Sequence, residues 1–338
     1  MKYQYLNADE MIRRTIILNE SRANPSKSPL HIAYGIDRNF LLGCGVSITS
    51  ILLHNRDINF VFHVFIDEIY EDDEKRFSEL ATSYNTSIQV HIVNCDRLRS
   101  FPTTKNWSIA MYFRFVIGDY FIGLEEKILY LDADIVCQNK IDELTTIDLG
   151  SYVAGVVPER DEKWWALRAK SLDCDDIVSG YFNSGVLLLN IPAWSTEFVS
   201  KKAISMLADR KLTAKLTYMD QDILNLILLR KVKFIDGKYN TQFSLNYELK
   251  EKYISPISER TALIHYVGPT KPWHSWASYP SSEPFLNAKQ LSPWKNTSLM
   301  RPNTSNYARY CAKHNFKQNK IMHGIINYIY YYYLKVVK

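Results

Sequence analysis

Apolar residues in the first half of the chain recur in two alternating patterns. Short continuous apolar runs are typical of buried strands, and they predict strands over residues 31–34, 59–66, 88–93 and 127–132. Longer segments with helical spacing predict helices over residues 41–53, 72–84 and 108–117. The first of these helices has small residues, such as Gly43 and Gly45, on one side. Strands that alternate with helices are typical of an open α/β sheet.

Both ends of the chain differ from this pattern. The first 28 residues are polar, with a weak helical pattern over residues 8–18. After Gly150 the pattern predicts strands over 152–157 and 186–190 and helices over 200–208 and 222–229, and from Pro256 onward it indicates long loops. We therefore expect an N-terminal extension (1–28), one α/β domain (29–287) and a small helical tail that is basic and aromatic (288–338).

The tail differs from the rest of the chain in charge. The whole chain has 41 basic and 36 acidic residues, a net charge of +5, but no acidic residue follows Glu283. Nine basic residues lie beyond it, which leaves residues 1–283 with a net charge of −4. The tail is also rich in tyrosine near its end.

Lysine and tyrosine together suit a membrane interface, where anionic headgroups attract the lysines. The same residues could pack on the protein core or stack on single-stranded nucleic acid. The acidic character of residues 1–283 argues against nucleic acid, so we expect a membrane surface as the partner of the tail.

Several classes of protein are disfavoured by the sequence. The N-terminus has no apolar segment of the kind that signal peptides carry, and no apolar run is long enough to span a bilayer. Five cysteines without a C-x-x-C pair argue against a disulfide framework and a structural zinc site, and favour a reducing cytosol. The motifs of P-loop proteins, dinucleotide-binding proteins and serine hydrolases are absent.

An Asp-x-Asp pair follows the strand that begins at Lys127. Residues i and i+2 of an extended chain point the same way, so the carboxylates of Asp132 and Asp134 are predicted to converge. Converging carboxylates suit a hard divalent cation, Mg²⁺ or Mn²⁺, which in turn can bind the oxygens of a diphosphate. The alternative is a pair of solvated aspartates at the end of a strand.

Three further segments carry candidate chemistry. His265 follows a strand-like run and could be a third metal ligand, while Gly268 and Lys271 in the same loop suit a phosphate. Asn183 stands in an Asn-Ser-Gly segment, interpreted as a turn, where its amide could bind a hydroxyl-rich ligand. Asp220, Gln221 and Asp222 precede a helix, where capping explains at least one of the aspartates but not the glutamine.

Taken in order, these motifs resemble those of family 8 retaining glycosyltransferases. The matching segments are Gly35-x-Asp37, Tyr130-Leu-Asp-Ala-Asp134, Phe182-Asn-Ser-Gly185, Asp220-Gln-Asp222 and His265-Tyr-x-Gly-Pro-x-Lys-Pro-Trp273. The resemblance covers residues 30–290, and it is strongest toward the enterobacterial lipopolysaccharide core hexosyltransferases that form an α-1,3 linkage. The segment from Asn240 to Lys250 and the tyrosine-rich tail strengthen this narrower resemblance.

The resemblance implies a GT-A fold, a UDP-hexose donor and a lipopolysaccharide core acceptor. It implies Mg²⁺ or Mn²⁺ held by Asp132, Asp134 and His265. It further implies that the nucleotide is held by Gly35, Asp37, Asn39, Phe40 and Ala133, the diphosphate by Gly268 and Lys271, and the donor hexose by Arg114, Asn183, Asp220 and Gln221. An aspartate that the family often carries after the strand at 153–157 has no clear equivalent, since Pro158-Glu-Arg-Asp161 occupies that region.

Within this resemblance we expect transfer of glucose from UDP-glucose with retention of configuration, at the cytoplasmic face of the inner membrane. Retention often indicates a carboxylate nucleophile. The residue expected below the sugar is Gln221, an amide, which favours front-face attack with Asp220 and Gln221 stabilising positive charge on the sugar. UDP-galactose as donor, or a carbohydrate- or membrane-binding module without catalysis, are the alternatives.

Overall fold

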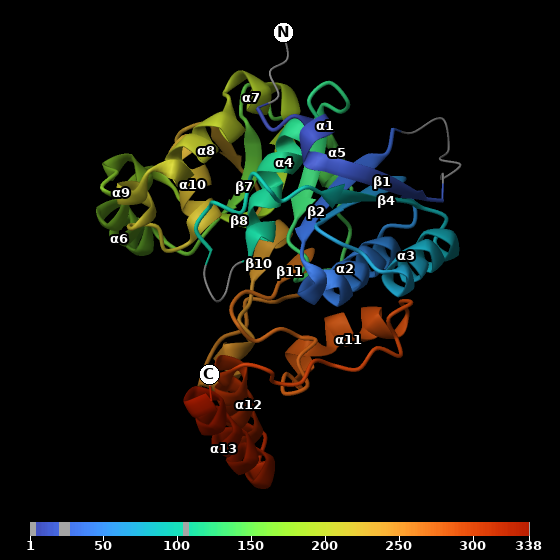
Figure 1. Ribbon diagram of the computed structural model, residues 1–338, viewed down its shortest axis with the longest axis vertical. Helices are drawn as coiled ribbons and strands as arrows, with labels where there is room; N and C mark the ends of the chain where they lie inside the picture. The colour runs from blue at the N-terminus through green and yellow to red at the C-terminus, as the bar shows by residue number, and fades with distance from the viewer. Residues whose placement is uncertain (1–4, 20–27, 104–107, 338) are drawn as a thin grey trace.

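The computed structural model describes residues 5–19, 28–103 and 108–337. An eight-stranded mixed sheet with the order β1-β4-β3-β2-β5-β8-β7-β9 forms its centre (Figure 1). Its strands are β1 (Ile12–Leu18), β2 (Leu30–Ile36), β3 (Phe60–Ile66), β4 (Ser87–Val93), β5 (Lys127–Leu131), β7 (Ala154–Pro158), β8 (Phe182–Asn190) and β9 (Val232–Phe234). A second sheet, of order β10-β11-β6, contains β6 (Ile135–Cys137), β10 (Thr241–Gln242) and β11 (Leu263–His265).

The order of the strands reverses beside β2. The chain leaves β2 for β3 and β4 on one side, and later returns to place β5, parallel to β2, on the other side. Ligands of open α/β sheets bind at the carboxyl ends of strands beside such a reversal. Asp37 follows β2 and Asp132 follows β5, so both lie at this edge.

Helices cover both faces of the large sheet because its strands are apolar on both sides. On one face, α2 (Leu41–His54) and α3 (Glu71–Ser83) pack on side chains such as Ile32 and Leu129. On the other face, α4 (Phe113–Tyr120), α8 (Val199–Ala208) and α10 (Met219–Ile227) pack on Ala33 and Leu187. The other helices of the main body are α1 (Ala8–Met11), α5 (Glu143–Thr146), α6 (Glu162–Leu172), α7 (Ile191–Thr196), α9 (Arg210–Thr213) and α11 (Glu283–Gln290).

The α/β pattern predicted from the sequence is confirmed, but two local interpretations are wrong. Residues 12–18 form an edge strand, antiparallel to β4, because pairing with an existing sheet outweighs a weak helical pattern. The Asn-Ser-Gly segment lies inside β8, not in a turn. Residues 1–4 and 20–27 of the expected N-terminal extension lie outside the described residues.

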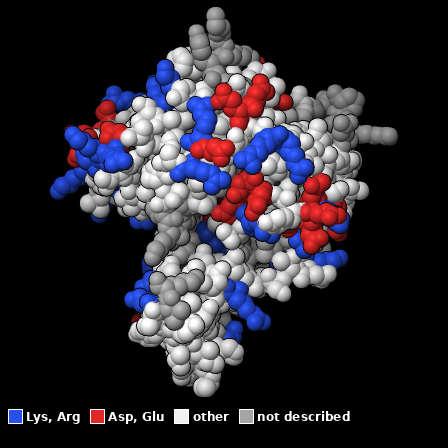
Figure 2. Space-filling view, in the orientation of Figure 1, with Lys and Arg blue, Asp and Glu red and all other residues white. Residues whose placement is uncertain are grey.

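Two antiparallel helices follow the main body, α12 (Ser305–Lys317) and α13 (Ile321–Val337), here called the C-terminal hairpin. The hairpin projects from the body at the bottom of Figure 1, and its visible surface in Figure 2 is largely white and blue. Helix α12 buries Ala308, Ala312 and His314. Helix α13 instead exposes large apolar side chains, namely Ile321, Met322, Ile325, Ile326, Ile329, Tyr332, Tyr333 and Val336. Among the described helices, none has the length and hydropathy needed to cross a bilayer.

A row of hydrogen-bonded side chains crosses four strands of the large sheet. Thr15 lies 2.9 Å from His91, His91 lies 3.1 Å from His63, His63 lies 3.0 Å from His31, and His31 lies 3.2 Å from Glu125. Burial lowers the pKa of all three histidines, that of His91 to about 3. A neutral imidazole donates once and accepts once, so the row is satisfied only while its histidines stay neutral.

Acidification is therefore expected to destabilise the fold. The unfolded chain binds protons below the ordinary histidine pKa of about 6.5 while the folded row does not, so stability is present above that pH and lost below it. Each histidine that the fold holds neutral lowers the free energy of unfolding by about 1.4 kcal/mol when the pH falls from 7.5 to 5.5. Urea unfolding at the two pH values checks this, and His63→Gln, which cannot titrate, should lose less stability than the wild type. An equal loss in both proteins would contradict the explanation.

Candidate active site

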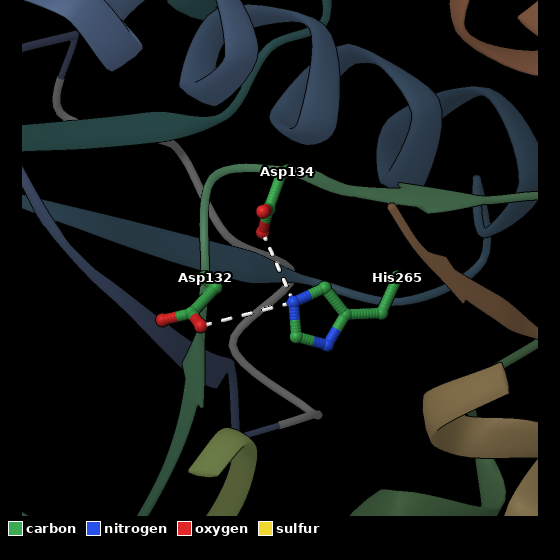
Figure 3. Close-up of side chains that lie close together, drawn as sticks. All are labelled: Asp132, Asp134 and His265. Atoms are coloured by element: carbon green, nitrogen blue, oxygen red, sulfur yellow. Dashed lines mark ion pairs between the residues drawn. The ribbon is translucent and has the colours of Figure 1, made fainter. Parts of the chain in front are cut away.

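Asp132, Asp134 and His265 meet where the two sheets adjoin. Asp132 follows β5, and Asp134 precedes β6 in a tight turn. Strand β11 pairs antiparallel with β6, which sets His265 opposite Ile135. In Figure 3 the imidazole points between the carboxylates, with Nε2 at 3.2 Å from Asp134 Oδ1 and 3.8 Å from Asp132 Oδ2. The predicted convergence of the aspartates thus arises across a turn and not along an extended strand.

These three side chains fit a hard divalent cation. One ligand atom from each residue lies within 4.8 Å of the others, and the set combines two carboxylates with an imidazole. Apart from its contact with His265 Nε2, the buried Oδ1 of Asp134 has no hydrogen-bond partner among the described residues. Burial alone would raise the pKa of Asp134, but the ammonium of Lys271 beside it holds that pKa below its ordinary value. The carboxylate is therefore ionised and able to bind a cation.

Arg114 on α4 connects the acid pair, Asp132 and Asp134, to a third carboxylate. Its side chain is buried, and it lies 3.2 Å from Asp132 Oδ1 and 2.9 Å from Asp220 Oδ2. It also donates to the carbonyl oxygen of Ser184 at 2.8 Å. Burial raises the pKa of Asp220 to about 6, although Arg114 opposes this shift. A buried guanidinium thus holds Asp132 and Asp220 close together.

Asp220, Gln221 and Asp222, in the first turn of α10, have different roles. Asp222 is fully buried and accepts hydrogen bonds from the amides of Thr217 and Tyr218, both at 2.8 Å, and from Arg168 at 2.7 Å. Asp222 is therefore a structural residue, which fixes the segment before α10 and ties it to α6. Gln221 accepts a hydrogen bond from the amide of Ser184 at 3.0 Å, which places it with Asp220 next to β8 and the acid pair.

The loop after β11 brings Lys271 to the same site. Its ammonium contacts Asp134 and donates to the carbonyl oxygen of Tyr266 at 2.8 Å. Gly268 has a φ of +87°, a left-handed conformation that glycine adopts at little cost. Beneath this loop, Gly43 of α2 lets the backbone of Ala133 approach, since a Cβ there would lie 2.7 Å from the carbonyl oxygen of Ala133.

Two cavities lie at strand ends on either side of β5. One, of about 590 Å³, lies at the carboxyl ends of β2, β3 and β4 and is lined by Asp37 and Asn39. The other, of about 570 Å³, lies beyond β7 and is lined by Glu159 and Asn240. Strand β5, which Asp132 follows, stands between these two groups of strands in the sheet.

Two predicted nucleotide residues have structural contacts. Gly35 allows α4 to pack on β2, since a Cβ there would lie 2.8 Å from Phe113 Cβ. The ring of Phe40 lies edge-on to Trp273, with 5.6 Å between the ring centres. Their contacts with a nucleotide stay predictions.

Sequence reasoning missed several polar side chains of the site. Tyr130 donates to Asp132 Oδ1 at 2.7 Å, and the alternation of β5 could have found it two residues before Asp132. Glu159 follows β7 and lies 2.8 Å from Asn183 Nδ2, whereas Asp161 caps α6. Glu159 is thus the carboxylate after β7 that lies beside Asn183, and Asp161 is a helix cap. Asn240, 2.9 Å from His265 Nδ1, gave no signal of its role.

Known proteins are similar to this chain in fold and in sequence. The solved structure of the galactosyltransferase LgtC in complex with donor and acceptor sugar analogues superposes with a TM-score of 0.67, at 24% identity, over 78% of this chain and 96% of that one. That likeness concerns the fold, which is GT-A. Residues 31–277 match glycosyl transferase family 8, and residues 279–335 match its C-terminal family.

The chain belongs to glycosyltransferase family 8 and is an enzyme. It is 52% identical to the lipopolysaccharide glucosyltransferase WaaO of Escherichia coli, over 91% of each chain. It is 48% identical to the lipopolysaccharide 1,3-galactosyltransferase of Salmonella typhimurium, over 98% of each chain. Both the resemblance and the fold class predicted from the sequence are confirmed.

Gly185→Ala is expected to disrupt the candidate metal ligands. A Cβ at this position would lie 2.3 Å from His265 Cε1 and 2.9 Å from Asp132 Oδ2, so both side chains would have to move. We expect Mn²⁺ affinity, measured by electron paramagnetic resonance, to fall at least tenfold, as for other disturbed metal shells. Gly237→Ala is the control, because a Cβ there meets nothing within 4 Å. Equal affinities in the two variants would contradict the geometry.

Proposed function

We propose that this enzyme transfers a hexose from a UDP-hexose to the lipopolysaccharide core, with retention of configuration and with Mg²⁺ or Mn²⁺ bound by Asp132, Asp134 and His265. The observation that carries the proposal is the cluster of Asp132, Asp134 and His265 beside the reversal of strand order, with cavities at the strand ends on either side of β5. The similarity to lipopolysaccharide glucosyl- and galactosyltransferases over nearly the whole chain supports the acceptor class.

The two cavities suggest how donor and acceptor divide the site. The cavity at β2–β4 would take uridine, through Asp37 and Asn39, with Gly35 and Phe40 nearby in sequence. The cavity lined by Glu159, beyond β7, would take the acceptor sugar. The diphosphate would then lie between them, at the acid pair, and the hexose near Asn183.

The residues of the site account for the chemistry. The bound cation would stabilise negative charge on the departing UDP. Lys271, released from Asp134, would place its ammonium on the same phosphates, with the Gly268 backbone allowing close approach. Asp220 and Gln221 would face the sugar and stabilise positive charge that develops on it. Since an amide is a poor nucleophile, we favour front-face attack, with a phosphate oxygen of the leaving UDP accepting the acceptor's proton.

Glucose is the donor sugar we favour, and galactose is the second candidate. The favoured assignment rests on identity, which is 52% to the glucosyltransferase and 48% to the galactosyltransferase. The two sugars differ in the orientation of one hydroxyl, which changes only a hydrogen bond or two.

Release of UDP tests the proposed reaction. The enzyme, supplied with Mn²⁺ and lipopolysaccharide truncated at successive core sugars, should release UDP from UDP-glucose faster than from UDP-galactose. Asp132→Asn should lower this rate by roughly a hundredfold or more, because the cation stabilises the transition state by several kcal/mol. Asp142→Asn, at an exposed aspartate before α5, is the control and should keep its rate.

Two outcomes would count against the assignment. Binding of sugar without release of UDP from any UDP-hexose would indicate a non-catalytic carbohydrate-binding module. Full metal-dependent activity of Asp132→Asn would show that the metal site lies elsewhere. A faster rate with UDP-galactose would select the second donor and leave the reaction class intact.

We further propose that the C-terminal hairpin attaches the enzyme to the cytoplasmic face of the inner membrane. Its support is the exposed apolar surface of α13 in a tail that carries basic but no acidic residues. Apolar side chains can enter the headgroup region while lysines attract anionic lipids. We expect no binding to nucleic acid.

Ile329→Ser should weaken binding to anionic vesicles. Ile329 is 65% exposed on α13, so the change should leave the fold intact and remove apolar area that would otherwise enter the membrane. Leu167→Ser is the matched control, because Leu167 is 67% exposed on α6, away from the hairpin. Co-sedimentation with vesicles measures the effect. Equal weakening in both variants, or a preference of the protein for single-stranded DNA, would contradict the assignment.

A further inference from the structure

A chain of buried side chains leads away from the proposed metal ligand His265. His265 Nδ1 lies 2.9 Å from Asn240 Oδ1, and Asn240 Nδ2 donates to Asn183 Oδ1 at 2.9 Å. Asn183 Nδ2 in turn donates to Glu159 Oε2 at 2.8 Å. Asn240 is only 2% exposed and lies on the 3-10 turn just before β10. It thus connects the metal site with Asn183, where we place the donor hexose.

One backbone group, the amide N–H of Gly185, sets the direction of every hydrogen bond in this row of side chains. The amide N–H of Gly185 can only donate, and it lies 3.0 Å from the side-chain oxygen of Asn183. Asn183 therefore presents its oxygen to Asn240, which must present its NH₂ group in return. The opposite end of the Asn240 amide is then its oxygen, and this oxygen faces His265.

An oxygen facing Nδ1 decides the tautomer of His265. Nδ1 must carry the proton in order to donate to Asn240, so Nε2 of the neutral ring carries a lone pair. Nε2 is the atom directed at Asp132 and Asp134. Metal-binding histidines are commonly fixed in this way, by a hydrogen bond to the nitrogen that does not bind the metal.

We propose that Asn240 is a positioning residue that holds His265 in the tautomer able to bind the divalent cation and couples this cation to the donor hexose through Asn183. The inference rests on the metal site of the proposed function. The two ends of the Asn240 amide have separate roles. Its oxygen accepts a hydrogen bond from His265 and so positions the ligand of the cation. Its NH₂ group donates to Asn183 and so positions the residue beside the sugar.

Two substitutions separate these tasks. Asn240→Asp keeps an oxygen facing Nδ1 but loses the N–H that faces Asn183. Asn240→Leu loses both. In the full-length enzyme with UDP, we expect Asn240→Leu to weaken Mn²⁺ binding, followed by electron paramagnetic resonance, by about 10- to 100-fold. Asn240→Asp should bind Mn²⁺ as tightly as the wild type or more tightly.

The second readout concerns the donor sugar. In Asn240→Asp two oxygens face each other at Asn183, which should displace the Asn183 side chain. We expect the KM for UDP-hexose to rise in Asn240→Asp while its affinity for UDP with Mn²⁺ stays unchanged, because UDP alone does not reach Asn183. Asn55→Leu is the control for loss of a buried asparagine, since Asn55 accepts from the amide of Ile141 at 2.9 Å and does not contact His265. It should lower thermal stability without changing Mn²⁺ affinity.

The results that would overturn the inference are distinct from failure of the proposed function. Wild-type enzyme that binds no Mn²⁺ in the presence of UDP would refute the metal site itself. If the wild type binds Mn²⁺ and Asn240→Leu binds it equally well, Asn240 does not position His265. Should Asn240→Leu fail to fold, a loss of Mn²⁺ affinity in folded Asn240→Asp would refute the role of the oxygen. An unchanged KM for UDP-hexose in Asn240→Asp would refute the coupling to the sugar.

Discussion

Repulsion between buried carboxylates is the constraint on which this site depends. Asp134 and Asp220 are nearly inaccessible to solvent, and Asp132 lies between them at the end of β5. Like charges in a buried environment are tolerated only when positive groups compensate them. Arg114 compensates Asp132 and Asp220 permanently, because its guanidinium is locked between them. Lys271 compensates Asp134 from a loop.

The difference between these two cations gives the site its chemistry. Arg114 is buried and bonded to backbone as well as to carboxylates, so it acts as fixed framework. The ammonium of Lys271 pairs with Asp134 and with one backbone carbonyl, that of Tyr266, from the end of a flexible side chain. A divalent cation between Asp134 and His265 would satisfy Asp134 in its place and free Lys271 for the diphosphate. Charge balance thus connects binding of the cation with binding of the donor.

Much of this arrangement could be predicted from the sequence, since it depends on local pattern. Apolar runs predicted most of the strands, and the ends of two such runs pointed to Asp132 and His265 as candidate site residues. Small residues were recognised on one side of α2, and the structure packs Trp294 against one of them, Gly45. Polar site residues at strand ends can be predicted from the sequence, because they directly follow an apolar run whose end can be recognised.

What could not be predicted depends on contacts between distant segments. Residues 12–18 became a strand because β4 offered an edge to pair with. Glu159, Asn183 and Asn240 come from three separate segments, and nothing local in the sequence indicates that their side chains meet. The interpretation of Asn-Ser-Gly as a turn was wrong for a related reason. The small residue there is required by His265, which packs against Gly185 from 80 residues away in sequence.

The most direct test of this account is a crystal structure of the enzyme with Mn²⁺ and a non-hydrolysable UDP-hexose, with the manganese located by its anomalous scattering. The account predicts one manganese ion bound by Asp132, Asp134 and His265 Nε2, at about 2.0–2.2 Å, with Lys271 moved from Asp134 to the diphosphate. An ion bound elsewhere, or a Lys271 that still pairs with Asp134 while the donor is bound, would contradict it.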